Sequence, residues 1–167
     1  DRSAEVLSTI RGVAVWDGSA WHETKKRPLA DLNELPSPYV MGLVPPGGLG
    51  VLQTYRGCPS TCSFCEWGTM ASPKRVRTAE HLAEEFEAMA QLGVSGALLV
   101  DAGLNLNRRA FEQLSLAARQ TRFFEDRKLI SEVYPAKIQD EHIEFLSHVG
   151  SPLVGIGLQS FDNDVLA

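Results

Sequence analysis

The sequence lacks a fourth cysteine. Its 167 residues include only three, Cys58, Cys62 and Cys65, and these lie within eight consecutive positions. An odd number of cysteines in one tight cluster does not suit a disulfide-stabilised secreted protein, so we expect a reducing, cytoplasmic environment. Structural zinc sites and ordinary ferredoxin clusters are closed by four protein ligands. Three thiols alone complete neither kind of site.

Long apolar runs and an excess of basic charge are also missing. No stretch approaches the roughly 20 apolar residues that span a bilayer, and residues 1–5 do not resemble a signal peptide. The formal net charge is −5, which gives no general attraction to nucleic acid or to an anionic membrane. We therefore expect no nucleic-acid or membrane partner. The chain begins without Met and ends abruptly at Leu166-Ala167, so we expect a piece of a longer protein.

The first 43 residues differ from the rest of the chain. A short helical stretch at 4–10 is followed by two short runs on either side of Asp17-Gly18, a dipeptide typical of a β-hairpin. Residues 27–39 are rich in proline and have no clear periodicity, which indicates an extended connector.

From residue 50 onward, apolar strands alternate with amphipathic helices. Thr78 and Asn107 are candidate N-caps for the first two helices. The expected strands are 50–54, 97–100, 128–133 and 152–158, and the expected helices are 78–93, 107–118 and 140–148. Such alternation predicts a parallel sheet covered by helices. The predicted fold is α/β: a partial (β/α) barrel of the TIM type, with about four β/α repeats, preceded by the hairpin and linker.

The cysteines have the spacing C-x3-C-x2-C and directly follow the first strand. A [4Fe–4S] cluster held by three thiolates has one iron without a protein ligand, and that iron can bind a substrate. An open iron–sulfur cluster is therefore our leading interpretation. The alternatives are a partial zinc site and three inert buried cysteines.

The segment from Arg56 to Cys65, RGCPSTCSFC, closely resembles the radical S-adenosylmethionine (SAM) enzymes. The resemblance implies that Cys58, Cys62 and Cys65 hold a [4Fe–4S] cluster whose open iron chelates SAM. Reductive cleavage of SAM then gives methionine and a 5′-deoxyadenosyl radical. The aromatic residue before the third cysteine, Phe64, is expected to pack near the adenine.

Three later strand ends carry further candidates for binding SAM. Asp101 stands where family members often have a Gly-Gly-Glu turn, so it is a candidate for the SAM ammonium, or else a helix cap. Glu132 resembles a ribose-binding glutamate of the members that oxidise porphyrinogens; the alternative is an exposed strand-end carboxylate. Gln159, in a Gly-Leu-Gln-Ser segment, resembles a second ribose ligand, or else caps the next helix.

The connector indicates which branch of the family the chain resembles. The segment DLNELPSPY at 31–39 is similar to the linker of cobalamin-binding radical SAM proteins, in which a cobalamin domain precedes the barrel. The resemblance implies a linker at 1–43 after a missing cobalamin-binding domain, and the N-terminal half of the radical SAM core at 44–167. Methylation of a small molecule or peptide, with cobalamin as a further cofactor, is the implied chemistry. Other radical rearrangements occur in the same branch, and an electron donor such as flavodoxin or ferredoxin is implied.

A second class of function stays open on the sequence alone, namely a non-catalytic iron–sulfur or zinc-binding module. The histidines add no further metal site, because His81, His142 and His148 fall on predicted outer helices and are expected at the surface.

Overall fold

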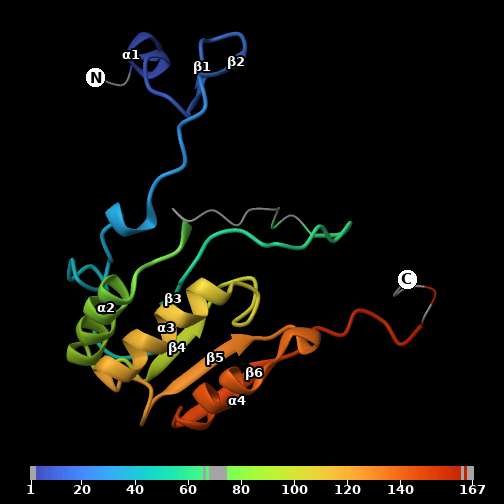
Figure 1. The fold of residues 1–167 in the computed structure, drawn as a ribbon. Coiled ribbons are helices and arrows are strands. Elements are labelled where there is room, and N and C mark those ends of the chain that lie inside the picture. Colours follow the sequence, from blue (N-terminus) through green and yellow to red (C-terminus); the bar gives the residue numbers. More distant parts are fainter. Residues whose placement is uncertain (1–2, 66, 68–74, 163, 165–167) are drawn as a thin grey trace. The chain divides into compact units, whose positions relative to one another are not determined.

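The computed structural model describes residues 3–65, 67, 75–162 and 164 (Figure 1). The chain divides into two compact units, Asp1–Ala30 and Asp31–Ala167. Residues 31–43, the later part of the expected linker, thus lie in the second unit. In the described part of the chain, no helix has the length and apolar character needed to cross a membrane.

The first unit contains a short helix and a hairpin, as the sequence predicts. These elements are α1 (Ala4–Ser8), β1 (Ala14–Trp16) and β2 (Trp21–Glu23), and the two strands are antiparallel. The carboxylate of Asp17 accepts a hydrogen bond from the backbone N–H of Ala20 at 2.9 Å, which closes the turn. This bond and its neighbours hold the pKa of Asp17 well below its ordinary value.

The second unit is built on a parallel four-stranded sheet. Its strands are β3 (Gly50–Leu52), β4 (Gly96–Leu99), β5 (Lys128–Glu132) and β6 (Ser151–Gly155), in the order β3-β4-β5-β6. The strands are parallel throughout, so their carboxyl ends share one edge. At Gly96 a Cβ atom would lie only 2.2 Å from the carbonyl oxygen of Lys128, so glycine permits the close approach of β4 and β5.

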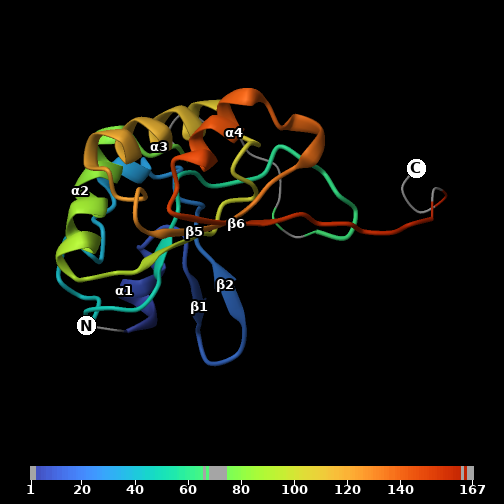
Figure 2. The same cartoon turned by 90° about the horizontal axis from the view of Figure 1, so that it is seen from below.

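Three helices cover one face of this sheet (Figure 2). They are α2 (Ala79–Gln91), α3 (Arg108–Thr121) and α4 (Asp140–Ser147); two 3₁₀ turns, η1 (Leu32–Glu34) and η3 (Pro135–Lys137), complete the described elements. The side chains of Thr78 and Asn107 each accept a hydrogen bond from the backbone N–H three residues on, as expected of N-caps. The α/β prediction is confirmed.

The core lies between the sheet and the helices. Phe86 of α2 is fully buried and stacks on Phe123, with ring centroids 5.0 Å apart, while Phe124 meets it edge-on at 5.3 Å. Other fully or almost fully buried members are Leu52, Leu82, Met89, Ala97, Leu114 and Leu129. Burial of one such aromatic ring is worth about 3–5 kcal/mol against alanine, so this layer holds the strand ends in place.

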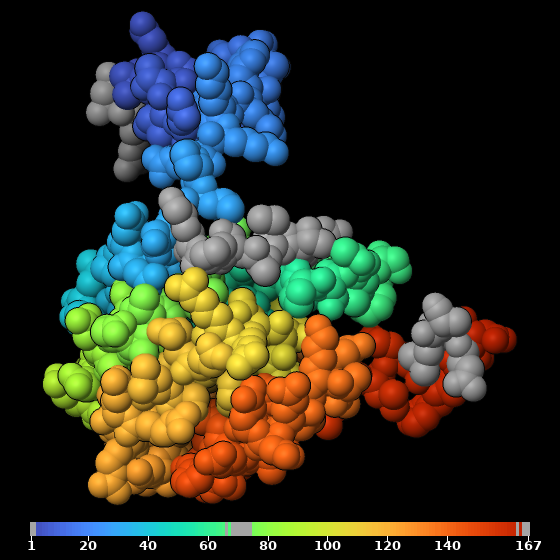
Figure 3. Space-filling view, viewed as in Figure 1, coloured from blue at the N-terminus to red at the C-terminus, as the bar shows by residue number. Residues whose placement is uncertain are grey.

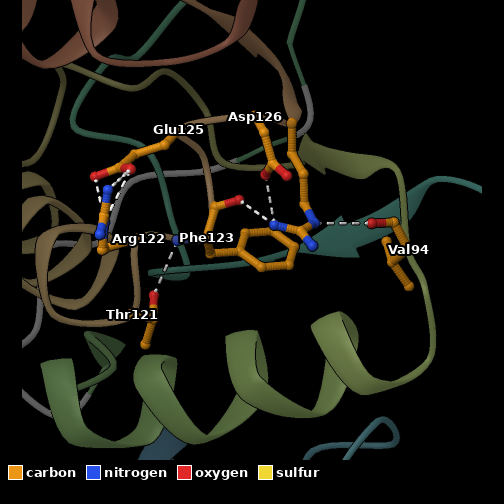
Figure 4. Close-up of polar contacts among 7 residues, drawn as sticks. Val94, Thr121, Arg122, Phe123, Glu125 and Asp126 are labelled. Carbon is orange, nitrogen blue, oxygen red and sulfur yellow. Dashed lines mark hydrogen bonds and ion pairs between the residues drawn. The ribbon is translucent and has the colours of Figure 1, made fainter.

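The connection from α3 to β5 is fixed by two arginines (Figure 4). Arg122 ends α3 in the left-handed region (φ 57°) and pairs with Glu125, with Nη2 and Oε2 2.6 Å apart. Arg127 donates to the carbonyl oxygens of Phe123 (3.0 Å) and Val94 (3.2 Å). Its guanidinium carbon also lies 4.9 Å from the centroid of the Phe123 ring. These contacts join the start of β5 to the loop before β4.

The opposite face of the sheet is apolar, and no described helix of the second unit covers it. Val51, Leu98, Ile130 and Leu153 are register partners across the four strands. Along β3, β4 and β5 they alternate with residues buried under the helices, whereas every residue of β6 is exposed. Val51 is 52% exposed and Leu153 49%. A row of large apolar side chains of this kind marks a surface that is usually covered by other protein.

Within the second unit, residues 31–39 are held tightly against α2 and β3. Asn33 hydrogen-bonds the backbone just before α2, and the hydroxyl of Ser37 donates to Glu85 Oε1 at 3.0 Å. The hydroxyl of Tyr39 accepts from the backbone N–H of Val51 on the edge strand β3 at 2.7 Å. The proline-rich segment is therefore an ordered cover for α2 and for the free edge of β3.

Candidate functional site

The cysteine loop follows β3 and is closed at its base. The backbone N–H of Arg56 donates to the carbonyl oxygen of Arg75 at 2.9 Å, and that of Arg77 donates to Thr54 at 2.8 Å. The side chain of Tyr55 is buried and its hydroxyl donates to the carbonyl oxygen of Gly103 at 3.1 Å. The loop therefore starts and ends at one fixed point on the carboxyl edge of the sheet.

Within the loop the three thiols are accessible. Cys58 is half-buried, while Cys62 and Cys65 are exposed. The backbone N–H of Cys65 donates to the carbonyl oxygen of Cys62 at 3.1 Å, and that of Ser60 donates to Cys58 Sγ at 3.4 Å. Among the described residues no three Cys, His, Asp or Glu side chains converge on a metal position. The donor set nevertheless fits an iron–sulfur cluster, because thiolates are its usual ligands and one loop offers three.

Asp101, after β4, is buried and fully engaged with the end of β3. Its Oδ1 accepts from the backbone N–H groups of Thr54 (2.9 Å) and Tyr55 (3.3 Å), and its Oδ2 accepts from the hydroxyl of Thr54. Burial raises the pKa of Asp101 to about 6, against the opposing effect of these hydrogen bonds. The same burial, together with the charge of Asp101, raises the pKa of Tyr55. The carboxylate therefore joins the carboxyl end of β4 to that of β3.

A second set of hydrogen bonds joins the loops after β4 and β5. Asn105 exchanges two hydrogen bonds with the backbone of Tyr134, donating to its carbonyl oxygen and accepting from its N–H, both at 2.8 Å. The backbone N–H of Leu104 donates to the carbonyl oxygen of Glu132, also at 2.8 Å. Asn105 is not among the residues that the sequence singles out, because its only signal is an amide side chain after a buried strand.

Glu132 and Gln159, by contrast, are exposed. Glu132 is the last residue of β5 and lies on the uncovered face, beside Gly155 of β6. A Cβ atom at Gly155 would lie 3.4 Å from Glu132 Cγ, an ordinary van der Waals contact, so the Glu132 side chain lies directly over Gly155. Gln159 follows β6, and its Nε2 lies over Gly157. Neither carboxylate nor amide has a hydrogen-bond partner among the described residues.

Phe64 lies in the cysteine loop and is 70% exposed. The candidates therefore form three groups along one edge. Asp101 and the base of the cysteine loop are in direct contact, while Glu132 at the end of β5 and Gln159 after β6 have free polar groups. Phe64 and the thiols of Cys62 and Cys65 lie on the open loop.

Comparison with known proteins identifies the family to which the chain belongs. The sequence profile of the Radical SAM superfamily matches residues 52–167. The chain is 31% identical over 150 residues to the 2-(S-pantetheinyl)-carbapenam-3-carboxylate methyltransferase of Streptantibioticus cattleyicolor, covering 80% of this chain and 22% of that protein. It is 32% identical over 118 residues to the cobalamin-dependent radical SAM methyltransferase TokK of Streptomyces tokunonensis, covering 63% of this chain and 17% of TokK.

The matches cover only part of each relative but most of this chain's second unit. The chain spans about a fifth of the length of the two curated relatives. The profile begins at the end of β3 and includes the whole cysteine loop and all later strands. The resemblance seen in the sequence is confirmed, and the chain belongs to the radical SAM superfamily.

Proposed function

We propose that this chain is the cluster- and SAM-binding part of a cobalamin-dependent radical SAM methyltransferase. The observation that carries the proposal is the C-x3-C-x2-C loop, anchored at the carboxyl end of the first strand of a parallel β/α array. In parallel α/β folds, ligands bind at the carboxyl ends of the strands. The family match covers the same residues.

The cysteine loop supplies the ligands in this proposal. Cys58, Cys62 and Cys65 would hold a [4Fe–4S] cluster, which when bound supplies the electron that cleaves SAM to methionine and a 5′-deoxyadenosyl radical. The chain's own contribution is to position the loop. Asp101 does so by binding Thr54 and Tyr55, and the ring of Tyr55 is in turn fixed to the loop after β4.

The free polar groups at the ends of β5 and β6 can bind the ribose of SAM. The carboxylate of Glu132 can accept hydrogen bonds from both ribose hydroxyls, and Gln159 can bind the same sugar. Phe64 offers an exposed ring to the adenine. A direct contact of Asp101 with the SAM ammonium would have to share oxygens that Thr54 and Tyr55 already occupy. We therefore assign Asp101 mainly to positioning the loop.

The uncovered sheet face supports the proposed domain organisation. Its apolar row at Val51, Leu98, Ile130 and Leu153 would become the interior of a barrel closed by further β/α units. On this view residues 1–43 are the linker after a cobalamin-binding domain, and 44–167 are the N-terminal half of the radical SAM core. The substrate, a small molecule or peptide, would enter at the carboxyl ends of the strands.

The names of the relatives support the part of the proposal that concerns cobalamin and methyl transfer. Both are named as methyltransferases, and TokK is named as cobalamin-dependent. The linker resemblance at residues 31–39 points the same way. We place the reaction in the cytoplasm, where a flavodoxin or ferredoxin can supply electrons.

Anaerobic reconstitution with iron and sulfide tests the proposal. We expect about four irons and four acid-labile sulfides per chain, and an EPR signal of the reduced protein that changes when SAM is added. Cys58→Ala, Cys62→Ala and Cys65→Ala should each lose the SAM-dependent change, while Ser60→Ala, in the same loop, should keep it. Stoichiometric zinc without labile sulfide would instead support a non-catalytic metal-binding module. A normal cluster in all three cysteine variants would refute the assignment.

A further inference from the structure

A cavity of about 250 Å³ adjoins the cysteine loop on the side of the helices. It is lined by residues of the loop and of the start of α3, namely Tyr55, Gly57, Pro59, Leu106, Asn107, Arg108 and Arg109. Gly57 and Pro59 are the two neighbours of Cys58. In Figure 3 the yellow residues at the start of α3 lie next to the green residues of the loop. The cavity thus leads directly to the backbone that carries the first cysteine.

The lining of the cavity comes from the cysteine loop and from the start of α3, not from the uncovered face of the sheet. Tyr55 packs against Val76 and against Ala110 of α3, so this wall of the cavity belongs to the helix layer. Glu132 lies on the uncovered face of the sheet, with Val51 and Leu98. A partner bound at the cavity would approach Cys58 without occupying the space that SAM and the substrate need.

The surroundings of the cavity are basic, although the chain is acidic overall. Arg108 and Arg109 line the cavity, and Arg56 and Arg75 lie at the base of the cysteine loop. Arg108 is paired with Glu112, with Nε and Oε1 2.9 Å apart. Arg109 is exposed, and its guanidinium has no hydrogen-bond or ion-pair partner among the described residues.

The two arginines at the base keep their charges available. Arg56 Nε donates to Gln53 Oε1 at 2.8 Å, and Arg75 Nε donates to the carbonyl oxygen of Arg56 at 3.2 Å. Both partners are neutral. Arg56 and Arg109 are exposed and Arg75 is half-buried, and none of these three is paired with a carboxylate among the described residues. In a chain of net charge −5, these groups beside one loop give a local positive field around the proposed cluster, to which Arg108 adds less because Glu112 partly neutralises it.

We propose that this arginine patch (Arg56, Arg75, Arg108 and Arg109) docks the acidic face of a one-electron carrier protein. The inference rests on the proposed function. The reduced carrier loses one electron, the oxidised cluster gains one, and no bond or proton is transferred. Complementary charge at an interface mainly raises the rate of association and fixes orientation. An acidic carrier would also be repelled by the remainder of this acidic chain, so the patch would select one orientation.

Binding of an acidic bacterial flavodoxin to the full-length protein tests the patch. Affinity is measured by calorimetry, on apo and reconstituted protein, at low and high salt. Arg109→Glu should weaken binding about tenfold at low ionic strength, and the effect should fade at about 0.5 M salt, where charges are screened within a few ångström. Lys128→Glu, at the opposite end of the sheet, makes the same change of charge and should alter the affinity less than twofold.

Reduction kinetics give a second readout. In stopped-flow experiments, Arg109→Glu should slow reduction of the cluster by flavodoxin hydroquinone but not by dithionite, a small reductant that needs no docking surface. Equal effects of Arg109→Glu and Lys128→Glu on flavodoxin binding would overturn the patch. Absence of any cluster, with the Arg109-dependent binding intact, would instead overturn the proposed function and leave the docking surface standing.

Discussion

The carboxyl edge of the sheet has two halves with different polar chemistry. At β3 and β4 the polar groups are buried and bind one another, as Asp101 does with Thr54 and Tyr55. At β5 and β6 the side chains of Glu132 and Gln159 are exposed and have no partner among the described residues. The difference indicates that the first half positions the cysteine loop, while the second half is free to bind a ligand.

Removal of Asp101 should give the largest loss of stability. Asp101→Ala leaves two backbone N–H groups and the hydroxyl of Thr54 without their acceptor, which should lower the free energy of unfolding by about 3 kcal/mol at pH 5. Urea denaturation measures this. Glu132→Ala, at the exposed half of the edge, should change it by less than about 0.5 kcal/mol. Equal losses in the two variants would contradict the division of the edge.

The stabilising effect of Asp101 should also depend on pH. Its folded pKa of about 6 lies above the ordinary 3.8, so between these values the folded state binds more protons than the unfolded state. Stability of the wild type should therefore fall relative to Asp101→Ala as pH rises from 4 to 7, by about 2 kcal/mol. Unfolding of both proteins across this range gives the difference. A difference that is constant or grows with pH would show that hydrogen bonds, rather than burial, dominate the pKa of Asp101.

Asn105 should have an intermediate effect. Asn105→Ala removes both bonds to the backbone of Tyr134, which should cost about 1–2 kcal/mol of unfolding free energy and loosen the loop before α3. Hydrogen exchange at the N–H of Tyr134 should become faster. Gln159→Ala serves as the control amide deletion and should leave both the stability and this exchange rate unchanged.

The smallest change in stability, and the clearest change in binding, should come from Glu132. Glu132→Gln should alter the unfolding free energy by less than about 0.5 kcal/mol, because the side chain is exposed. The loss of a charged acceptor for the ribose hydroxyls should weaken SAM binding to the reconstituted protein about tenfold, as measured by equilibrium dialysis. An unchanged SAM affinity would remove Glu132 from the site.

Local sequence patterns predicted the elements of this fold well. Apolar runs located the strands, the Asp17-Gly18 turn located the hairpin, and the N-caps at Thr78 and Asn107 located two helix starts. Each of these signals acts between residues that are close in the sequence, so it can be recognised without knowing the fold.

The polar contacts that hold the edge together could not be predicted in this way. Asp101 meets Thr54 and Tyr55, and Ser37 meets Glu85, across more than 40 residues of sequence. Their pairing depends on the completed sheet. The expectation that His142 lies at the surface was wrong for the same reason: its ring is buried, 4.4 Å from that of Phe111 on α3.

The central claim is that the three thiols of one loop hold a cluster to which SAM binds directly. Electron–nuclear double resonance of the reduced, reconstituted protein with SAM labelled with ¹⁵N at its amino group tests this most directly. SAM bound directly to the cluster should give a ¹⁵N hyperfine coupling to it, which should be absent in Cys62→Ala. A reduced cluster that shows no coupling to bound SAM would contradict it.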